Sequence, residues 1–165
     1  MELSPSRAAA PDLHLVLVRP EIPWNTGNLG RTCLALGARL HLVRPLGFSL
    51  SAKAIRRAGL DYWPQVDLVL WQNWEAAFEE LEKLGSLWFF APGRGQSLYV
   101  APIELPAVLV FGSESCGLDP QLLEQQAHRV VQIPMHSPAV RSLNLSTAAA
   151  VAAFEVARRG RNLIP

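Results

Sequence analysis

Hydrophobic residues follow two alternating patterns along the chain, one typical of buried strands and the other of helices. Short runs rich in β-branched and aromatic residues predict strands, and apolar residues three or four positions apart predict helices. The expected strands are residues 13–18, 39–43, 66–71, 87–91, 107–111 and 129–133. The expected helices are residues 25–36, 51–58, 74–84, 120–127 and 145–159. Glycines follow four of these helices and mark their ends.

The alternation of strands and helices predicts an α/β fold, namely a mostly parallel sheet with helices on both faces. Residues 13–165 contain no internal repeat or linker, so we expect one domain there and a loose N-terminal arm at residues 1–12. Parallel sheets bind ligands beyond the carboxyl ends of their strands. The loops in which to look for chemistry therefore follow Val18, Ala91, Phe111 and Ile133.

The composition fits a globular chain and excludes several classes of protein. Of 165 residues, 50% are hydrophobic and 18% are charged, which excludes disorder along the whole chain. No apolar run reaches the roughly 18 residues of a membrane span, and the N-terminal arm has no apolar stretch of signal-peptide length. Cys33 and Cys116 form no zinc motif or disulfide framework. We therefore expect a cytoplasmic protein with no membrane segment and no metal.

Charge is distributed unevenly, although the net charge is only +1. Residues 1–60 carry eight basic and three acidic residues, residues 61–128 carry two and ten, and residues 129–165 carry five and one. If the two ends of the chain meet in the fold, they form a basic face opposite an acidic one. Arginine makes up 13 of the 15 basic residues, and its planar fork suits phosphate. A compositional bias toward arginine explains that count equally well.

The loop and helix after the first strand combine a possible anion site with an arginine. Asn25 or Thr26 can cap the helix, whose free N–H groups bind anions. Arg31 lies off the apolar stripe of the helix, so it projects toward solvent or a cleft. An ordinary capped helix with a solvated arginine fits the same spacing, and the spacing alone favours that interpretation.

The later loops lack complete nucleotide-binding motifs. Residues 92–97 lack the third glycine of a dinucleotide fingerprint, and Leu118-Asp119 replaces the Lys-Ser pair of a P-loop. Residues 112–117 remain either a small-residue turn that lets a ligand approach the backbone, or a turn whose glycines need a positive φ. The loop after Ile133 is about ten residues long, where two to six are usual. In it, Ser142 or Asn144 can cap the last helix.

Three segments together resemble the SPOUT class of RNA methyltransferases. They are residues 20–31 (PEIPWNTGNLGR), 109–118 (LVFGSESCGL) and 133–146 (IPM followed by RSLNLS). Their order and spacing are similar to those of the small single-domain tRNA ribose 2′-O-methyltransferases, and the nearest branch methylates the wobble cytidine or uridine. Trp24 and Ser113 depart from that branch, in which both positions are usually proline.

The resemblance implies a C-terminal trefoil knot, S-adenosylmethionine (S-adenosyl-L-methionine) as the methyl donor, and a homodimer with its active site at the subunit interface. The positions that match donor-binding residues of the family are Ala91, Gly112, Ile133 and Ser142. Arg31 matches an arginine implicated in activating the ribose hydroxyl. The positions that match supporting residues of the site are Asn25, Glu114, Ser142 and Asn144.

The implied substrate is tRNA, and basic residues at both ends of the chain would bind it. The candidates are Arg19, Arg56, Arg57 and Arg141, together with Arg158 and Arg159. Two alternatives stay open, namely 2′-O-methylation of another tRNA or rRNA position, and a non-catalytic α/β module that binds a nucleotide. Glu114 could either balance the positive charge of the donor or hold a neighbouring loop in place.

Overall fold

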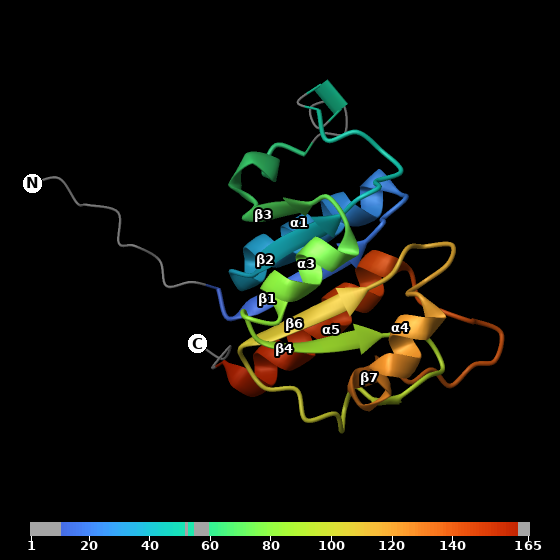
Figure 1. Cartoon of the computed structure of the whole chain (residues 1–165). Helices are drawn as coiled ribbons and strands as arrows, with labels where there is room; N and C mark the ends of the chain where they lie inside the picture. The colour runs from blue at the N-terminus through green and yellow to red at the C-terminus, as the bar shows by residue number, and fades with distance from the viewer. Residues whose placement is uncertain (1–10, 52, 55–59, 162–165) are drawn as a thin grey trace, which may run out of the picture.

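A seven-stranded sheet forms the centre of the computed structural model, which describes residues 11–51, 53–54 and 60–161 (Figure 1). All neighbouring strands pair in parallel, so their carboxyl ends share one edge of the sheet. In spatial order the strands are β3 (Leu68–Trp71), β2 (Arg39–Val43), β1 (Leu13–Val18), β6 (Ala107–Phe111), β4 (Ser86–Phe90), β7 (Val130–Gln132) and β5 (Gln96–Ser97).

Helices cover both faces of this sheet, which confirms the predicted α/β fold. On one face, α1 (Pro23–Leu36) and α5 (Leu145–Gly160) pack against each other, and α3 (Trp74–Leu81) and α4 (Pro120–Gln125) cover the other face (Figure 1). α1 and α5, one from each of the two basic end segments, therefore lie together, and α3, from the acidic middle segment, lies on the opposite face. None of the helices in the described part of the chain is long and apolar enough to cross a membrane. The trefoil knot stays a prediction.

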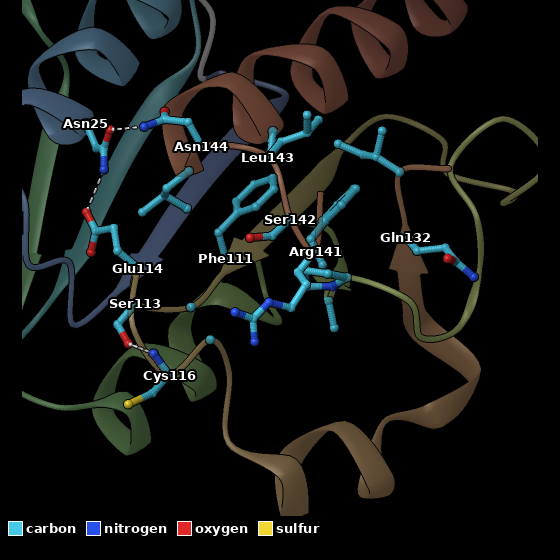
Figure 2. Close-up of a pocket in the computed structure, with 18 of the residues that line it drawn as sticks. Asn25, Phe111, Ser113, Glu114, Cys116, Gln132, Arg141, Ser142, Leu143 and Asn144 are labelled. Atoms are coloured by element: carbon cyan, nitrogen blue, oxygen red, sulfur yellow. Dashed lines mark hydrogen bonds between the residues drawn. The ribbon is translucent and has the colours of Figure 1, made fainter. Parts of the chain in front are cut away.

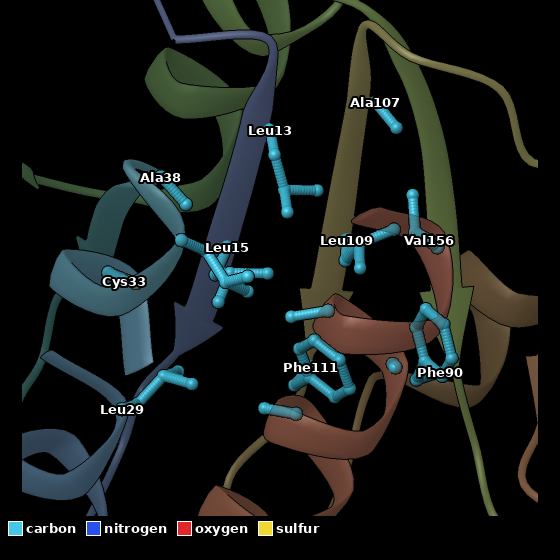
Figure 3. Close-up of a cluster of buried hydrophobic side chains, with 14 of the residues drawn as sticks. Leu13, Leu15, Leu29, Cys33, Ala38, Phe90, Ala107, Leu109, Phe111 and Val156 are labelled. Atoms are coloured by element: carbon cyan, nitrogen blue, oxygen red, sulfur yellow. The ribbon is translucent and has the colours of Figure 1, made fainter. Parts of the chain in front are cut away.

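Alternating side chains of the central strands fill two separate cores. On β1, Leu13, Leu15 and Leu17 face α1 and α5, whereas Val16 faces α3 and α4. Figure 3 shows the first core, in which Leu29 of α1 packs against these leucines. The strands are buried on both faces, as continuous apolar runs predict.

Several element boundaries differ from the predictions. The sequence patterns miss β5, because a strand of two residues has no periodicity; Gln96 and Ser97 pair with β7 at the sheet edge. α3 ends at Leu81, before the expected stop at Gly85. A short 3-10 helix, η1 (Trp63–Gln65), precedes β3, and another, η2 (Ala127–Arg129), follows α4. Most of the predicted helix 51–58 and of the predicted arm 1–12 lies outside the described residues.

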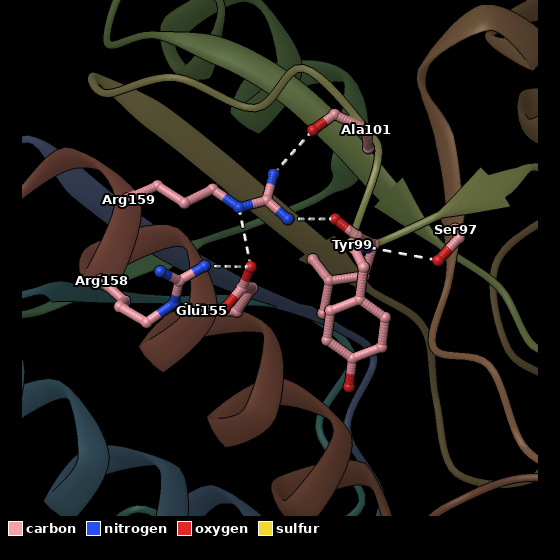
Figure 4. Close-up of polar contacts among 7 residues, drawn as sticks. Ser97, Tyr99, Ala101, Glu155, Arg158 and Arg159 are labelled. Atoms are coloured by element: carbon pink, nitrogen blue, oxygen red, sulfur yellow. Dashed lines mark hydrogen bonds and ion pairs between the residues drawn. The ribbon is translucent and has the colours of Figure 1, made fainter.

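Arg159 ties the last turn of α5 to the turn after β5 (Figure 4). Its guanidinium donates to the carbonyls of Leu98 (2.5 Å) and Ala101 (2.7 Å) and to the Glu155 carboxylate (2.8 Å). Hydrogen bonds from Arg158 and then Arg159 lower the pKa of Glu155 to about 2. The Arg159 guanidinium is thus occupied by contacts within the fold. This corrects the prediction from sequence that Arg159 contacts phosphate.

Two buried histidines connect three neighbouring strands. The Trp71 indole N–H of β3 donates to Nδ1 of His41 on β2 (3.1 Å), and His41 Nε2 lies 3.0 Å from Nδ1 of His14 on β1. Since Nδ1 of His41 accepts a hydrogen bond, the neutral ring carries its proton on Nε2 and donates to His14. Burial, with smaller contributions from His14 and Arg39, lowers the pKa of His41 to about 3. Burial and then Arg39 also lower the pKa of His14.

This pair predicts a loss of stability in mild acid. The His41 ring stays neutral in the folded protein well below pH 6.5, and the pKa of His14 is lowered as well, whereas in the unfolded chain both rings take up protons near pH 6.5. The free energy of unfolding should therefore fall as the pH drops from 6.5 toward 5, with a slope from His41 that approaches about 1.4 kcal/mol per pH unit and a contribution of the same sign from His14. Urea unfolding at pH 7.5 and 5.0 measures this. His41→Gln, neutral at every pH, should lose part of the slope, and an unchanged slope in that variant would contradict the account.

Candidate active site

A pocket of about 630 Å³ opens at the carboxyl edge of the sheet, beyond β4, β6 and β7 (Figure 2). All four loops singled out in the sequence contribute residues to it, because parallel strands bring their carboxyl ends to one edge. Its apolar lining comes from Phe90, Phe111, Ile133, Met135, Leu143 and Leu145. Its polar lining includes Asn25, Ser113, Glu114, Arg141, Ser142 and Asn144.

The structure brings nearly all of the predicted site residues to this pocket. The four predicted donor-binding positions, Ala91, Gly112, Ile133 and Ser142, all line it. Four of the five predicted catalytic positions do so as well, namely Asn25, Glu114, Asn144 and again Ser142. Arg31, the fifth predicted catalytic residue, is not part of the lining. His136 is exposed and does not line the pocket either.

The loop after β6 presents its backbone to the pocket because it contains two glycines. A Cβ atom on Gly112 would collide with the carbonyl carbon of Gly117, and Gly117 has a φ of 68°. The Gly117 N–H donates to the Ser113 carbonyl (2.9 Å) and closes the turn. The turn therefore needs glycine both for a close approach and for a left-handed conformation.

Glu114 fastens this loop to the start of α1. Its carboxylate accepts hydrogen bonds from the backbone N–H groups of Glu21 (2.7 Å) and Ile22 (3.1 Å) and from the side-chain amide of Asn25 (2.9 Å). The Glu21 carboxylate returns the contact by accepting from the Ser115 hydroxyl (2.5 Å) and backbone N–H (3.2 Å). Burial alone would raise the pKa of Glu114, but the hydrogen bonds from Asn25, Glu21 and Ile22 outweigh it and lower the pKa.

The same network continues to the start of α5. The Asn144 amide donates to the Asn25 side-chain carbonyl (2.9 Å), and Asn144 Oδ1 accepts from the N–H groups of Ser146 (2.9 Å) and Thr147 (3.3 Å). Asn144 is thus the N-cap of α5. Three segments distant in sequence are held together by one chain of side chains from Glu114 through Asn25 to Asn144.

The predicted cap of α1 is wrong. The helix begins at Pro23 with Ile22 at its N-cap position, so Asn25 and Thr26 lie inside the first turn and are both buried. Glu114 of the same chain already occupies the anion position at this helix end. The sequence pattern favoured the polar residue nearest the apolar stripe, and Pro23 at the first helical position was the signal that it overlooked.

Arg31 projects from the exposed face of α1, and its guanidinium lies over the Tyr62 ring, 4.6 Å from the centroid. The Tyr62 hydroxyl donates to the Gly27 carbonyl (2.8 Å) and so fixes the ring against the helix. Gly30 lets the neighbouring Trp63 pack against α1, because a Cβ atom there would lie 2.7 Å from the Trp63 ring. The sequence assigned no role to Tyr62, which lies under Arg31, or to Glu21, which binds Ser115 of the loop after β6.

The predicted RNA contacts lie in different places. Arg141 extends into the pocket between Ser113 and Ser142 (Figure 2). Arg19 is exposed beside a second hollow that adjoins the pocket, and its φ of 54° is unusual for a residue other than glycine. Arg56 and Arg57 lie outside the described residues. Among the residues that are described, no cluster of three or more His, Cys, Asp or Glu side chains could hold a metal ion.

A sequence profile described as the SpoU rRNA methylase family matches residues 12–154, which include every strand of the sheet and the whole lining of the pocket. The chain belongs to the SpoU methylase family. Membership of this family fits a site in which loops present their backbone groups to a pocket at the carboxyl edge of a parallel sheet.

Individual members of the SpoU family resemble this chain over most of its length. A tRNA (cytidine(34)-2′-O)-methyltransferase of Methylovorus glucosotrophus (strain SIP3-4) is 43% identical over 148 residues, which cover 88% of this chain and 94% of that protein. A solved structure described as giving structural insights into the 2-OH methylation of C/U34 on tRNA is 48% identical, with a TM-score of 0.82, covering 91% of this chain and 97% of that one.

A longer protein of known structure shares the fold at lower identity. The crystal structure of an AdoMet-bound rRNA methyltransferase from Sinorhizobium meliloti is 25% identical, with a TM-score of 0.76. The match covers 93% of this chain but only 57% of that one.

Proposed function

We propose that this protein transfers a methyl group from S-adenosylmethionine to the ribose 2′-hydroxyl of the wobble cytidine or uridine of tRNA. The observation that carries the proposal is the 630 Å³ pocket built by the Gly112–Gly117 turn and the loop before α5, in a chain 43% identical to a tRNA (cytidine(34)-2′-O)-methyltransferase. A tRNA substrate also supports a cytoplasmic location for the enzyme.

The pocket suits a molecule with an adenine ring and a polar tail. Its volume lies in the usual range for small-molecule sites, and apolar side chains form one wall while backbone and short polar groups form the rim. Ala91, Gly112, Ile133 and Ser142 would hold the donor there. When bound, the donor would supply an electrophilic methyl carbon on a positively charged sulfur, and the ribose oxygen would displace a neutral thioether from that carbon in line. By excluding water, the apolar wall favours a reaction in which opposite charges disappear.

Glu114 serves in this proposal to position the loop, because three hydrogen bonds already engage its carboxylate. Arg31 binds the RNA at the reacting ribose. A guanidinium stays protonated in essentially all proteins, so Arg31 stabilises the developing negative charge on the 2′-oxygen and clamps the flanking phosphate. The hydroxyl then loses its proton to water or to a phosphate.

The enzyme works as a homodimer in which Arg31 of one subunit serves the pocket of the other. Two observations support this proposal. Arg31 is exposed and is absent from the lining of its own pocket. On the neighbouring α5, Phe154 is 49% exposed in a row with the small residues Ala150 and Val151, a surface suited to packing against another helix.

Replacing Phe154 with glutamate should therefore convert the dimer into monomers and remove methylation, because a charge would be buried at the interface. Sedimentation or light scattering gives the mass, and labelled-methyl transfer gives the activity. Val100→Glu, at a residue that is 74% exposed on the turn after β5, is the matched control and should keep both. A fully dimeric and active Phe154→Glu enzyme would place the interface elsewhere.

Methylation of bulk tRNA with labelled donor, followed by mapping of the modified nucleotide, tests the proposed function. We expect label only on the ribose of the wobble nucleotide. Two observations favour this substrate over rRNA: the C/U34 neighbour is matched over 97% of its length, while the rRNA enzyme is matched over 57%. Label at another tRNA position would overturn the substrate assignment but would leave the proposed reaction, ribose 2′-O-methylation, in place.

A further inference from the structure

A narrow apolar groove of about 310 Å³ runs along the first turn of α1, apart from the pocket described above. We call it the Trp24 groove. Its lining includes Trp24, Thr26, Phe48, Leu50, Leu60 and Trp63. None of its described lining residues is acidic, and three are aromatic.

Trp24 is the most conspicuous of these residues, because 61% of this large apolar side chain is exposed. It precedes Arg31 by seven positions on α1, which places both on the same helix face about two turns apart. The groove is also continuous with the Arg31 environment through the segment that carries Leu60 and Tyr62: Leu60 lines the groove, and Tyr62 lies under the Arg31 guanidinium.

Thr26 adds a polar group beneath the groove. The residue is 1% exposed, and its hydroxyl has no hydrogen-bond partner among the residues that the structure describes. Lys53, exposed on the segment next to the groove, contributes positive charge.

An exposed aromatic ring, an apolar slot without acidic side chains and nearby cations are the features with which proteins bind unstacked bases of single-stranded RNA. We propose that the Trp24 groove receives a base of the substrate RNA next to the methylated nucleotide, stacked on the Trp24 indole. This inference rests on the proposed function and makes Trp24 a residue that binds and orients the substrate. A small charged donor would find no charged partner in this lining.

Anticodon stem–loop RNA carrying 2-aminopurine directly before or directly after the wobble nucleotide tests the proposal. The fluorescence of one of the two RNAs should be quenched on binding to the wild-type dimer, because the fluorescent base stacks on the indole. Trp24→Ala should abolish that quenching and weaken RNA binding by about tenfold, and Trp24→Phe should retain most of both. The Kd for the methyl donor should be the same in all three proteins.

Tyr99→Ala is the matched control. Tyr99 is 57% exposed and follows β5, at the sheet edge opposite the β2–β3 side where the groove lies, so its loss should leave the quenching unchanged. Unaltered quenching and RNA affinity in Trp24→Ala would overturn the inference. So would a monomeric Trp24→Ala protein, since Trp24 would then belong to the contact between two copies of the chain. A wild-type enzyme that methylates no tRNA would instead refute the proposed function.

Discussion

Replacing Arg31 with alanine should lower the rate of methyl transfer by about a thousandfold while leaving the Kd for S-adenosylmethionine unchanged. The size is that expected for removal of a preorganised group facing a developing negative charge. Donor binding should survive because Arg31 does not line the pocket of its own chain, and its guanidinium rests on Tyr62. Single-turnover methylation and donor titration by calorimetry measure the two quantities separately.

Arg39→Ala is the matched control for this prediction. Arg39 is also an arginine at the surface, with a half-buried side chain, but it begins β2 at the amino end of the strands and pairs with Asp67 (2.9 Å). Its loss should leave the rate within about twofold of the wild type, as is usual for surface ion pairs. A fast Arg31→Ala enzyme would remove Arg31 from the reaction, and weak donor binding in that variant would place its role in the pocket.

Glu114→Gln should both destabilise the fold and slow methylation. The new side-chain NH2 would face a backbone N–H group in place of an accepting oxygen, which costs about 1–3 kcal/mol for a partly buried group. For a domain of this size we expect the Tm to fall by about 5 °C. Methylation should fall by roughly a hundredfold, because the Gly112–Gly117 turn would lose its attachment to α1 and misplace the reactants.

Calorimetric melting and steady-state methylation test this prediction together. Glu124→Gln on the exposed side of α4 removes the same charge without a network and should change neither quantity. If Glu114→Gln melts as the wild type does but loses donor affinity, then Glu114 acts on the donor itself and does not serve to fasten the loop.

The sheet and the loops that form the pocket could be predicted from local patterns of the sequence, and the family resemblance supplied the individual donor-binding positions. The run Leu13–Val18 is buried on both faces, which is why it has no polar alternation, and such runs separated by helices imply parallel pairing. Parallel pairing alone then assembles loops that are distant in sequence. Ala91, Gly112 and Ser142 meet for this reason.

The remaining features depend on tertiary contacts that no local pattern contains. Spacing favoured Asn25 as a helix cap, but the carboxylate that holds this helix end comes from Glu114, far along the chain. β5 is two residues long and exists only because β7 offers an unpaired edge. Likewise, the absence of Arg31 from the lining of its own pocket depends on how α1 is oriented on the sheet, which no local pattern encodes.

The central claim is that Arg31 of one subunit completes the pocket of the other subunit. Complementation between two inactive variants tests this claim most directly. Arg31→Ala keeps an intact pocket, and Ser142→Trp fills the pocket with an indole while keeping Arg31. Co-expressed heterodimers contain one complete site if Arg31 acts across the interface, so a random mixture should recover about a quarter of wild-type activity. If Arg31 serves its own subunit, no site is complete, and activity no higher than that of the two separate variants would contradict the account.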